Sequence, residues 1–141
     1  MLESTREFIR KLEEAEVKYT VGEPTESGKD NVIISFGGDN MDTIRCALLF
    51  DTDNESAAVR VFNIVKIPSE KIAKMFITVN ALNIKYRFGK FCIDTNDNTV
   101  QMEMDVPFRA GSVGPVCLEM LMYSVSICDK AYPELMKAIW S

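Results

Sequence analysis

Apolar residues recur at intervals of three and four positions at the start of the chain, which predicts an amphipathic helix over residues 4–15. Ser4 and Glu7 have the spacing of a capping box, in which a hydroxyl and a carboxylate satisfy free N–H groups of the first turn. Residues 17–21 alternate between apolar and polar side chains and are compatible with a short strand, and a polar loop follows.

Three apolar runs come next, at residues 32–36, 43–51 and 57–65, and short polar segments separate them. Short apolar runs with such connections predict an antiparallel meander of three strands. A second helix is expected from Pro68, because one stripe of apolar residues then recurs with helical spacing: Ile72, Met75, Phe76, Val79 and Leu82. Asn83 is expected to end this helix in the left-handed conformation.

The rest of the chain predicts a hairpin and a broken helix. We expect residues 84–94 and 99–106 to form the two strands of the hairpin. Every second residue of the second strand is apolar: Val100, Met102, Met104 and Val106. Pro133 cannot donate a helical hydrogen bond, so we expect the last helix to break there and a short helix to follow over 133–140. The order α-βββ-α-ββ-α predicts one α+β domain over residues 1–141, with an antiparallel five-stranded sheet.

The meander also predicts a contact surface. If the loop at 52–56 closes its hairpin with an even register sum, one face carries the apolar residues Ile44, Cys46, Leu48, Phe50, Phe62 and Ile64. The other face then carries Ala47, Leu49, Val59 and Val61. Helices tend to cover one face of such a sheet, so we expect these last four residues to form a partner or dimer interface. The alternative is that the first helix or residues 17–28 cover them.

Composition removes most reaction chemistry. The chain has 141 residues, a formal net charge of -5 and no histidine, which excludes Ser-His-Asp and Cys-His mechanisms and histidine-ligated metals. Four cysteines lie in apolar stretches without CxxC spacing, so we expect reduced, structural thiols. The acidic balance argues against nucleic acid, and no apolar run approaches the ~18 residues of a membrane span. We therefore expect a cytoplasmic protein without a cofactor.

Two segments match known binding motifs only in part. Residues 51–55 are rich in oxygen ligands, but Ser56 and Phe62 stand where a calcium loop of the EF-hand type needs Gly and Glu. Aromatic and basic residues alternate over 86–91, but Phe88 stands where an RNA-recognition signature needs Gly. Neither motif supports a metal or an RNA site.

Three other segments carry a resemblance to a known family: Asn80–Asn83, Gly89–Asp94 and Asp129–Met136. Their order and spacing resemble the YbjN-domain family of bacterial proteins, whose fold is similar to that of class I type III secretion chaperones. The resemblance spans nearly the whole chain. It implies a sensory-transduction or stress regulator without established enzyme activity or cofactor, related in structure to dimeric chaperones that hold extended client segments.

The residues and the resemblance together predict a non-enzymatic protein-interaction module, chaperone-like or regulatory. We expect it to bind a protein client or partner and to form a homodimer. The alternative is a sensory regulator that binds an apolar small molecule in a pocket between helices and sheet, near Tyr86, Met102 and Tyr132.

Overall fold

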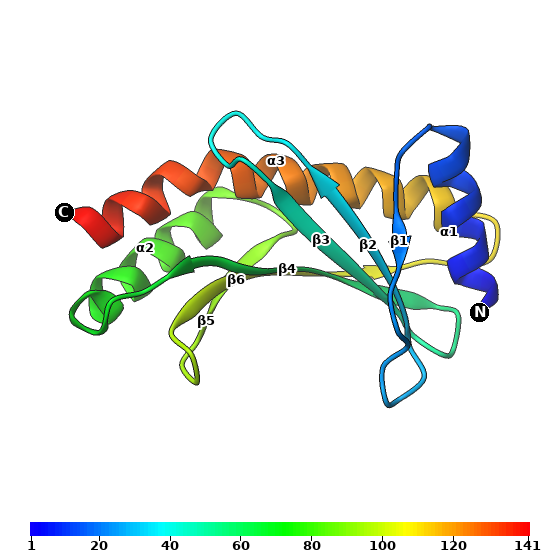
Figure 1. Cartoon of the computed structure of the whole chain (residues 1–141), viewed down its shortest axis with the longest axis horizontal. Coiled ribbons are helices and arrows are strands. Elements are labelled where there is room, and N and C mark those ends of the chain that lie inside the picture. Colours follow the sequence, from blue (N-terminus) through cyan, green and yellow to red (C-terminus); the bar gives the residue numbers. More distant parts are fainter.

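A six-stranded antiparallel sheet and three α-helices make up the computed structural model, which describes residues 1–141 (Figure 1). The helices are α1 (Glu3–Glu14), α2 (Ile72–Lys85, after a 3-10 turn at Ser69–Lys71) and α3 (Val113–Trp140). The strands are β1 (Thr20–Val21), β2 (Asp30–Phe36), β3 (Ile44–Phe50), β4 (Ser56–Lys66), β5 (Lys90–Asp94) and β6 (Thr99–Pro107). Their order across the sheet is β1-β2-β3-β4-β6-β5.

The α+β class and the antiparallel sheet are confirmed, but the count of five strands is wrong. The sixth strand is the short β1, in which Thr20 pairs with Ile33 and Val21 with Val32. Its two residues lie within segment 17–21, whose alternation is compatible with a short strand but which the predicted five-stranded order does not count. Tertiary pairing with β2, and not local propensity, makes this segment a strand.

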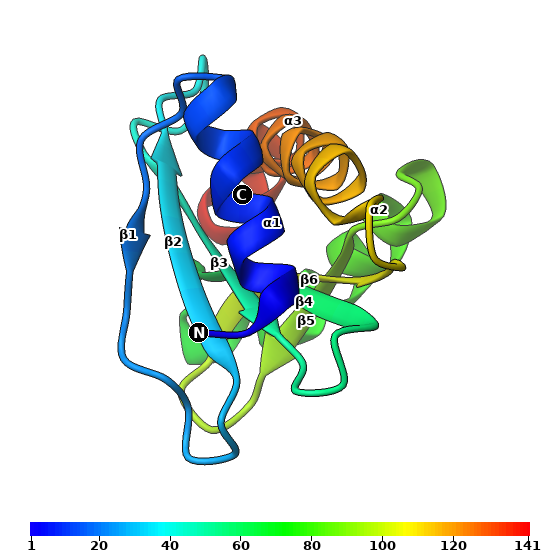
Figure 2. The ribbon, with the colours of Figure 1, turned by 90° about the vertical axis from the view of Figure 1, so that its right-hand side faces the viewer.

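The core lies between the sheet and the helices α1 and α3, which Figure 2 shows on the same side of the sheet. Strand register places Val32, Leu48, Val59 and Met104 side by side across four strands, and all four are buried. The alternation predicted for β6 is confirmed, because its four apolar residues are all buried. Helix α1 adds Phe8, whose ring lies 5.5 Å from that of Phe50.

Residues of β2 and of the loop between β3 and β4 cap helix α1, and the capping box predicted at its start is wrong. Asn54, in the loop between β3 and β4, accepts the Ser4 N–H through Oδ1 at 3.0 Å. Asp30 of β2 accepts further hydrogen bonds from the start of the helix. The Glu7 carboxylate accepts the N–H of Gly111 instead, at 3.1 Å from Oε2. Long-range partners thus replace the local pair and fix α1 on the sheet.

Helix α3 runs without a break from Val113 to Trp140, so the break expected at Pro133 is wrong. The proline leaves the carbonyl of Asp129 without its helical donor. The Asn40 side chain supplies a replacement, since Nδ2 donates to this carbonyl at 3.0 Å. The Asp129 carboxylate in turn accepts the backbone N–H groups of residues 39–41 at 2.8 to 3.1 Å. The loop between β2 and β3 therefore supports α3 at its proline.

Candidate interaction surfaces

No group of three or more Asp, Glu, Cys or His residues is placed to hold a metal ion. Burial raises the pKa of the Cys46 and Cys117 thiols to about 12, so both stay protonated near neutral pH. None of the helices combines the length and the hydrophobicity needed to cross a membrane. The exposed surfaces of the fold supply the candidate functional features.

The four residues predicted to form one interface lie on opposite faces of the sheet. Ala47 and Leu49 are half-buried on the open face, by which we mean the face away from α1 and α3. Val59 and Val61 point to the helix-covered face and are 0% and 2% exposed. The prediction that all four share a face is wrong.

The cause is the length of the loop between β3 and β4. The Asp51 N–H donates to the carbonyl of Ser56 at 3.0 Å, so four residues, and not five, form the loop. Leu48 consequently pairs with Val59, an odd register sum. A slip of one residue moves every side chain of a strand to the other face of the sheet.

The apolar part of the open face consists in part of other residues than predicted. Ala47 and Leu49 lie beside Ile33 and Ala58, their partners on β2 and β4. Phe62, expected on the face of Ile44, lies in an irregular stretch of β4 and is 50% exposed. No helix covers this patch, so it remains a candidate contact surface.

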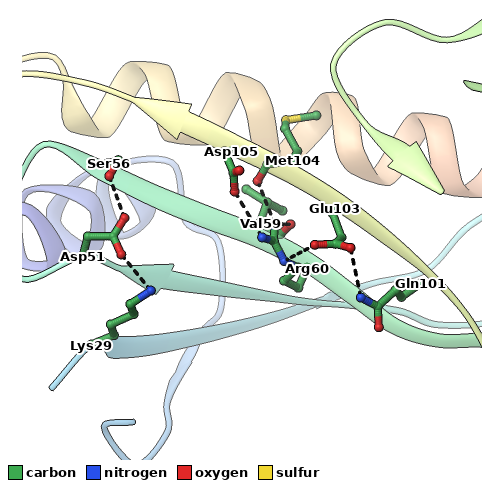
Figure 3. Close-up of polar contacts among 9 residues, drawn as sticks. All are labelled: Lys29, Asp51, Ser56, Val59, Arg60, Gln101, Glu103, Met104 and Asp105. Atoms are coloured by element: carbon green, nitrogen blue, oxygen red, sulfur yellow. Dashed lines mark hydrogen bonds and ion pairs between the residues drawn. The ribbon is translucent and has the colours of Figure 1, made fainter. Parts of the chain in front are cut away.

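A polar network occupies the next part of the open face, as Figure 3 shows. Arg60 Nε lies 3.1 Å from Glu103 Oε1, and its Nη2 lies 3.2 Å from Asp105 Oδ1. Nη1 of the same side chain donates to the carbonyls of Val59 and Met104. Arg60 is thus engaged by carboxylates and backbone together, and it ties β4 to β6.

Neutral hydrogen-bond donors and nearby cations together lower the pKa values of two carboxylates, Glu103 and Asp51. The Cys92 thiol, the Gln101 amide and the Arg60 charge lower the pKa of Glu103, although burial opposes them. The Ser56 hydroxyl and then Lys29 lower the pKa of Asp51 (Figure 3). These groups stabilise the sheet, and they are not poised to exchange protons near neutral pH.

Helix α2 carries apolar residues on both of its sides. One side packs on the body of the protein through Met75, Val79 and Leu82. On the other side Ile77 is 73% exposed and Ile84 is 79% exposed. We call this side the outer face of α2, and it consists of exposed residues at intervals of three and four: Ala73, Ile77, Ala81 and Ile84. A helix that is apolar on all sides is typically buried, so the outer face is unusual in a surface helix.

Sequence reasoning missed the outer face because it followed only one apolar stripe. That stripe included Phe76, which is in fact 48% exposed. The available signal was the near absence of charge, since Lys74 and Lys85 are the only charged residues among the 14 of α2.

A hollow of about 420 Å³ lies between the end of α2 and the middle of α3. It differs from the apolar pocket predicted near Tyr86, because Met102 is fully buried and Tyr132 does not line it. Its walls combine cations and aromatic rings, principally Lys85, Tyr86, Arg87, Phe88, Tyr123 and Lys130.

A side chain of α2 hydrogen-bonds to the free backbone edge of the edge strand β5. Asn83 Oδ1 accepts the Phe91 N–H at 2.7 Å, and its Nδ2 donates to the Phe91 carbonyl at 3.0 Å. Asn83 lies within α2, which ends at Lys85, so the prediction that Asn83 ends the helix is wrong. The carboxamide occupies the place of a neighbouring strand at this edge.

The surfaces described above lie within the part of the chain that matches a known protein family. The model of the YbjN family, described as "Putative bacterial sensory transduction regulator", matches residues 12–137. No curated protein matches the chain. Since the family model matches most of the 141 residues, the chain belongs to the YbjN family, as the resemblance in the sequence implied.

Proposed function

We propose that the chain is a non-enzymatic protein-interaction module that binds a protein partner through the outer face of α2. The observation that carries the proposal is the exposure of Ile77 and Ile84 on a helix whose other side is already buried. A regulator acts by changing the state of another molecule, and this role needs a contact surface more than it needs catalytic groups. The regulatory description of the YbjN family supports the same class of function.

The outer face has the dimensions of a helix-in-groove or helix-on-helix contact. Fourteen residues span about 21 Å at 1.5 Å per residue. Complete burial of an Ile side chain contributes about 1.5 to 3 kcal/mol, so Ile77 and Ile84, about three-quarters exposed, offer about 1 to 2 kcal/mol each. Ala73 and Ala81 between them let a partner helix approach closely.

A second copy of the chain is the first occupant we propose, because a small and acidic interaction module fits the homodimer that the resemblance implies. Ala47 and Leu49 on the open face of the sheet then form a second surface, which is free for a client segment. The chaperone-like role and the cytoplasmic location belong to this proposal. The four free cysteines support a reducing compartment.

Substitution on each surface separates the two contacts. Light scattering measures the mass of the wild type, Ile77→Glu and Leu49→Asp over a range of concentrations, and affinity capture from the native cell extract measures bound protein. Ile77→Glu should reduce the mass to that of a monomer, whereas Leu49→Asp should reduce only the captured partner.

Met122→Glu is the matched control, because Met122 is an apolar residue of α3 that is 45% exposed and lies outside both surfaces. It should change neither readout. A wild type that remains monomeric at every concentration and captures no protein would refute the proposed function.

A further inference from the structure

The hollow between α2 and α3 gathers positive charge in a chain whose net charge is -5. Lys85, Arg87 and Lys130 line it, and no carboxylate does. The ion pairs of the chain involve other cations, Lys29 and Arg60. These three cations therefore have no carboxylate partner, although the Lys85 ammonium lies over the Tyr86 ring, 5.3 Å from its centroid.

Aromatic rings line the same hollow beside the cations. Phe88 and Tyr123 are 53% and 44% exposed, and their ring centroids lie 5.4 Å apart. Phe88 has a φ of 69°, and the Gly89 N–H donates to the Arg87 carbonyl across it at 2.9 Å. Such a three-residue turn is uncommon for a residue with a side chain. It directs the ring of Phe88 toward α3 instead of the core.

The turn lies close against the sheet at Gly89. A Cβ at Gly89 would lie 2.7 Å from Sδ of the buried Met102, so the backbone is already in close contact with β6. Gly89 thus positions the end of the turn, while the ring of Phe88 packs on that of Tyr123.

An unused hydroxyl completes the lining. Ser124 of α3 donates to the carbonyl of Met120, as serine in a helix commonly does. Ser126, two residues later, lines the hollow and makes no hydrogen bond within the chain. Its hydroxyl is available to a ligand.

We propose that this hollow binds a small aromatic phosphate. The volume of about 420 Å³ falls in the range of ~300 to 1,000 Å³ that is usual for small-molecule sites. A phosphate monoester carries a charge of about -1.5 to -2 near pH 7, which matches several cations better than a single carboxylate does. The Arg87 guanidinium suits paired phosphate oxygens, and the rings of Phe88 and Tyr123 suit an aromatic body.

This inference goes beyond protein binding, because it gives the chain a small-molecule ligand. The ligand would join Lys130 of α3 to Arg87 in the turn after α2. Occupancy of the hollow would therefore restrain the end of the helix that carries the outer face.

Titration calorimetry with phenyl phosphate, inorganic phosphate and benzoate tests the inference on the full chain. Phenyl phosphate should bind with one site per chain and more tightly than either of the other two compounds. Lys130→Gln should weaken it by about 10- to 100-fold, the loss expected for one charge-assisted hydrogen bond. Phe88→Ala should reduce its affinity to that of inorganic phosphate.

Lys137→Gln is the control for general electrostatics, because Lys137 lies on α3 outside the hollow and is also exposed. It should leave the affinity for phenyl phosphate within about twofold, since an exposed charge outside the site contributes little. The inference is overturned if phenyl phosphate shows no saturable binding, if benzoate or inorganic phosphate binds equally well, or if Lys137→Gln has the effect of Lys130→Gln.

Discussion

Replacing Asn83 with alanine tests whether the hydrogen bonds of this α2 side chain to the edge strand β5 stabilise the fold. The substitution removes the two hydrogen bonds of 2.7 and 3.0 Å that the carboxamide makes with the backbone of Phe91. The Phe91 side chain is 2% exposed, and α2 packs over this strand, so water has restricted access to the peptide groups that lose their partner.

The magnitude follows from these two bonds. A buried donor or acceptor left without a partner costs about 1 to 3 kcal/mol, and part of this cost is recovered if water reaches the edge. Alanine favours the helix over asparagine by at most about 0.7 kcal/mol. We therefore expect Asn83→Ala to reduce the free energy of unfolding by about 1.5 to 3 kcal/mol.

Asn80→Ala is the matched control, because Asn80 lies one turn earlier in the same helix, is exposed and makes no side-chain hydrogen bond. Both variants gain the same helix propensity, so the difference between them isolates the edge contact. Urea unfolding gives the two free energies, and hydrogen exchange should show lost protection at the Phe91 amide in Asn83→Ala only. Equal stability of the two variants would refute the reasoning.

Three further outcomes are expected. Gly114→Val should destabilise the fold by about 1 to 3 kcal/mol in urea, because a Cβ at Gly114 would lie 2.8 Å from Lys11 Cβ where α1 crosses α3; unchanged stability would contradict this. Burial opposes ionisation of Asp30, but hydrogen bonds from the start of α1 outweigh it and lower the pKa of Asp30 below 3.8. The ionised carboxylate therefore stabilises the fold above pH 3.8, and this stabilisation is lost as the pH falls through the pKa of the folded state. The stability difference between wild type and Asp30→Asn should therefore shrink from pH 7 to pH 3, and a difference that grows would refute the assignment. Burial and then Glu103 raise the pKa of Cys92 to about 11, so a thiol reagent should label no cysteine rapidly at pH 7, and fast labelling of one thiol would contradict this.

The sequence predicted those parts of the fold in which one strand alone carries the pattern. In β6 the alternation from Val100 to Val106 identified the buried face correctly, because period two leaves no ambiguity within a strand. The pairing of β3 with β4 depended instead on one residue of loop length. Asn54 has a φ of 59°, and no local rule decided whether Ser56 belonged to the loop or to the ladder.

Long-range satisfaction of backbone groups explains the remaining errors. Pro133 frees the carbonyl of Asp129, and the helix continues because this carbonyl finds another donor. That donor, Asn40, lies 89 residues from Asp129 in the sequence. Asn83 likewise has the composition of a helix end but serves a strand eight residues later. The candidate site behaves in the same way, since the outer face of α2 is defined by which side the rest of the protein covers.

The contact at Pro133 also determines where α3 can lie along its own axis. In an ordinary helix every interior carbonyl is paired within the helix, so the carbonyls themselves do not distinguish one turn, about 5.4 Å of rise, from the next. Pro133 frees the carbonyl of Asp129 from the helical ladder, and Asn40 donates to it there while the Asp129 carboxylate accepts the N–H groups of residues 39–41. The proline therefore gives α3 one turn that the loop between β2 and β3 can recognise. This contact adds to side-chain packing in setting the axial position of α3, and with it the position of Lys130 beside the turn after α2.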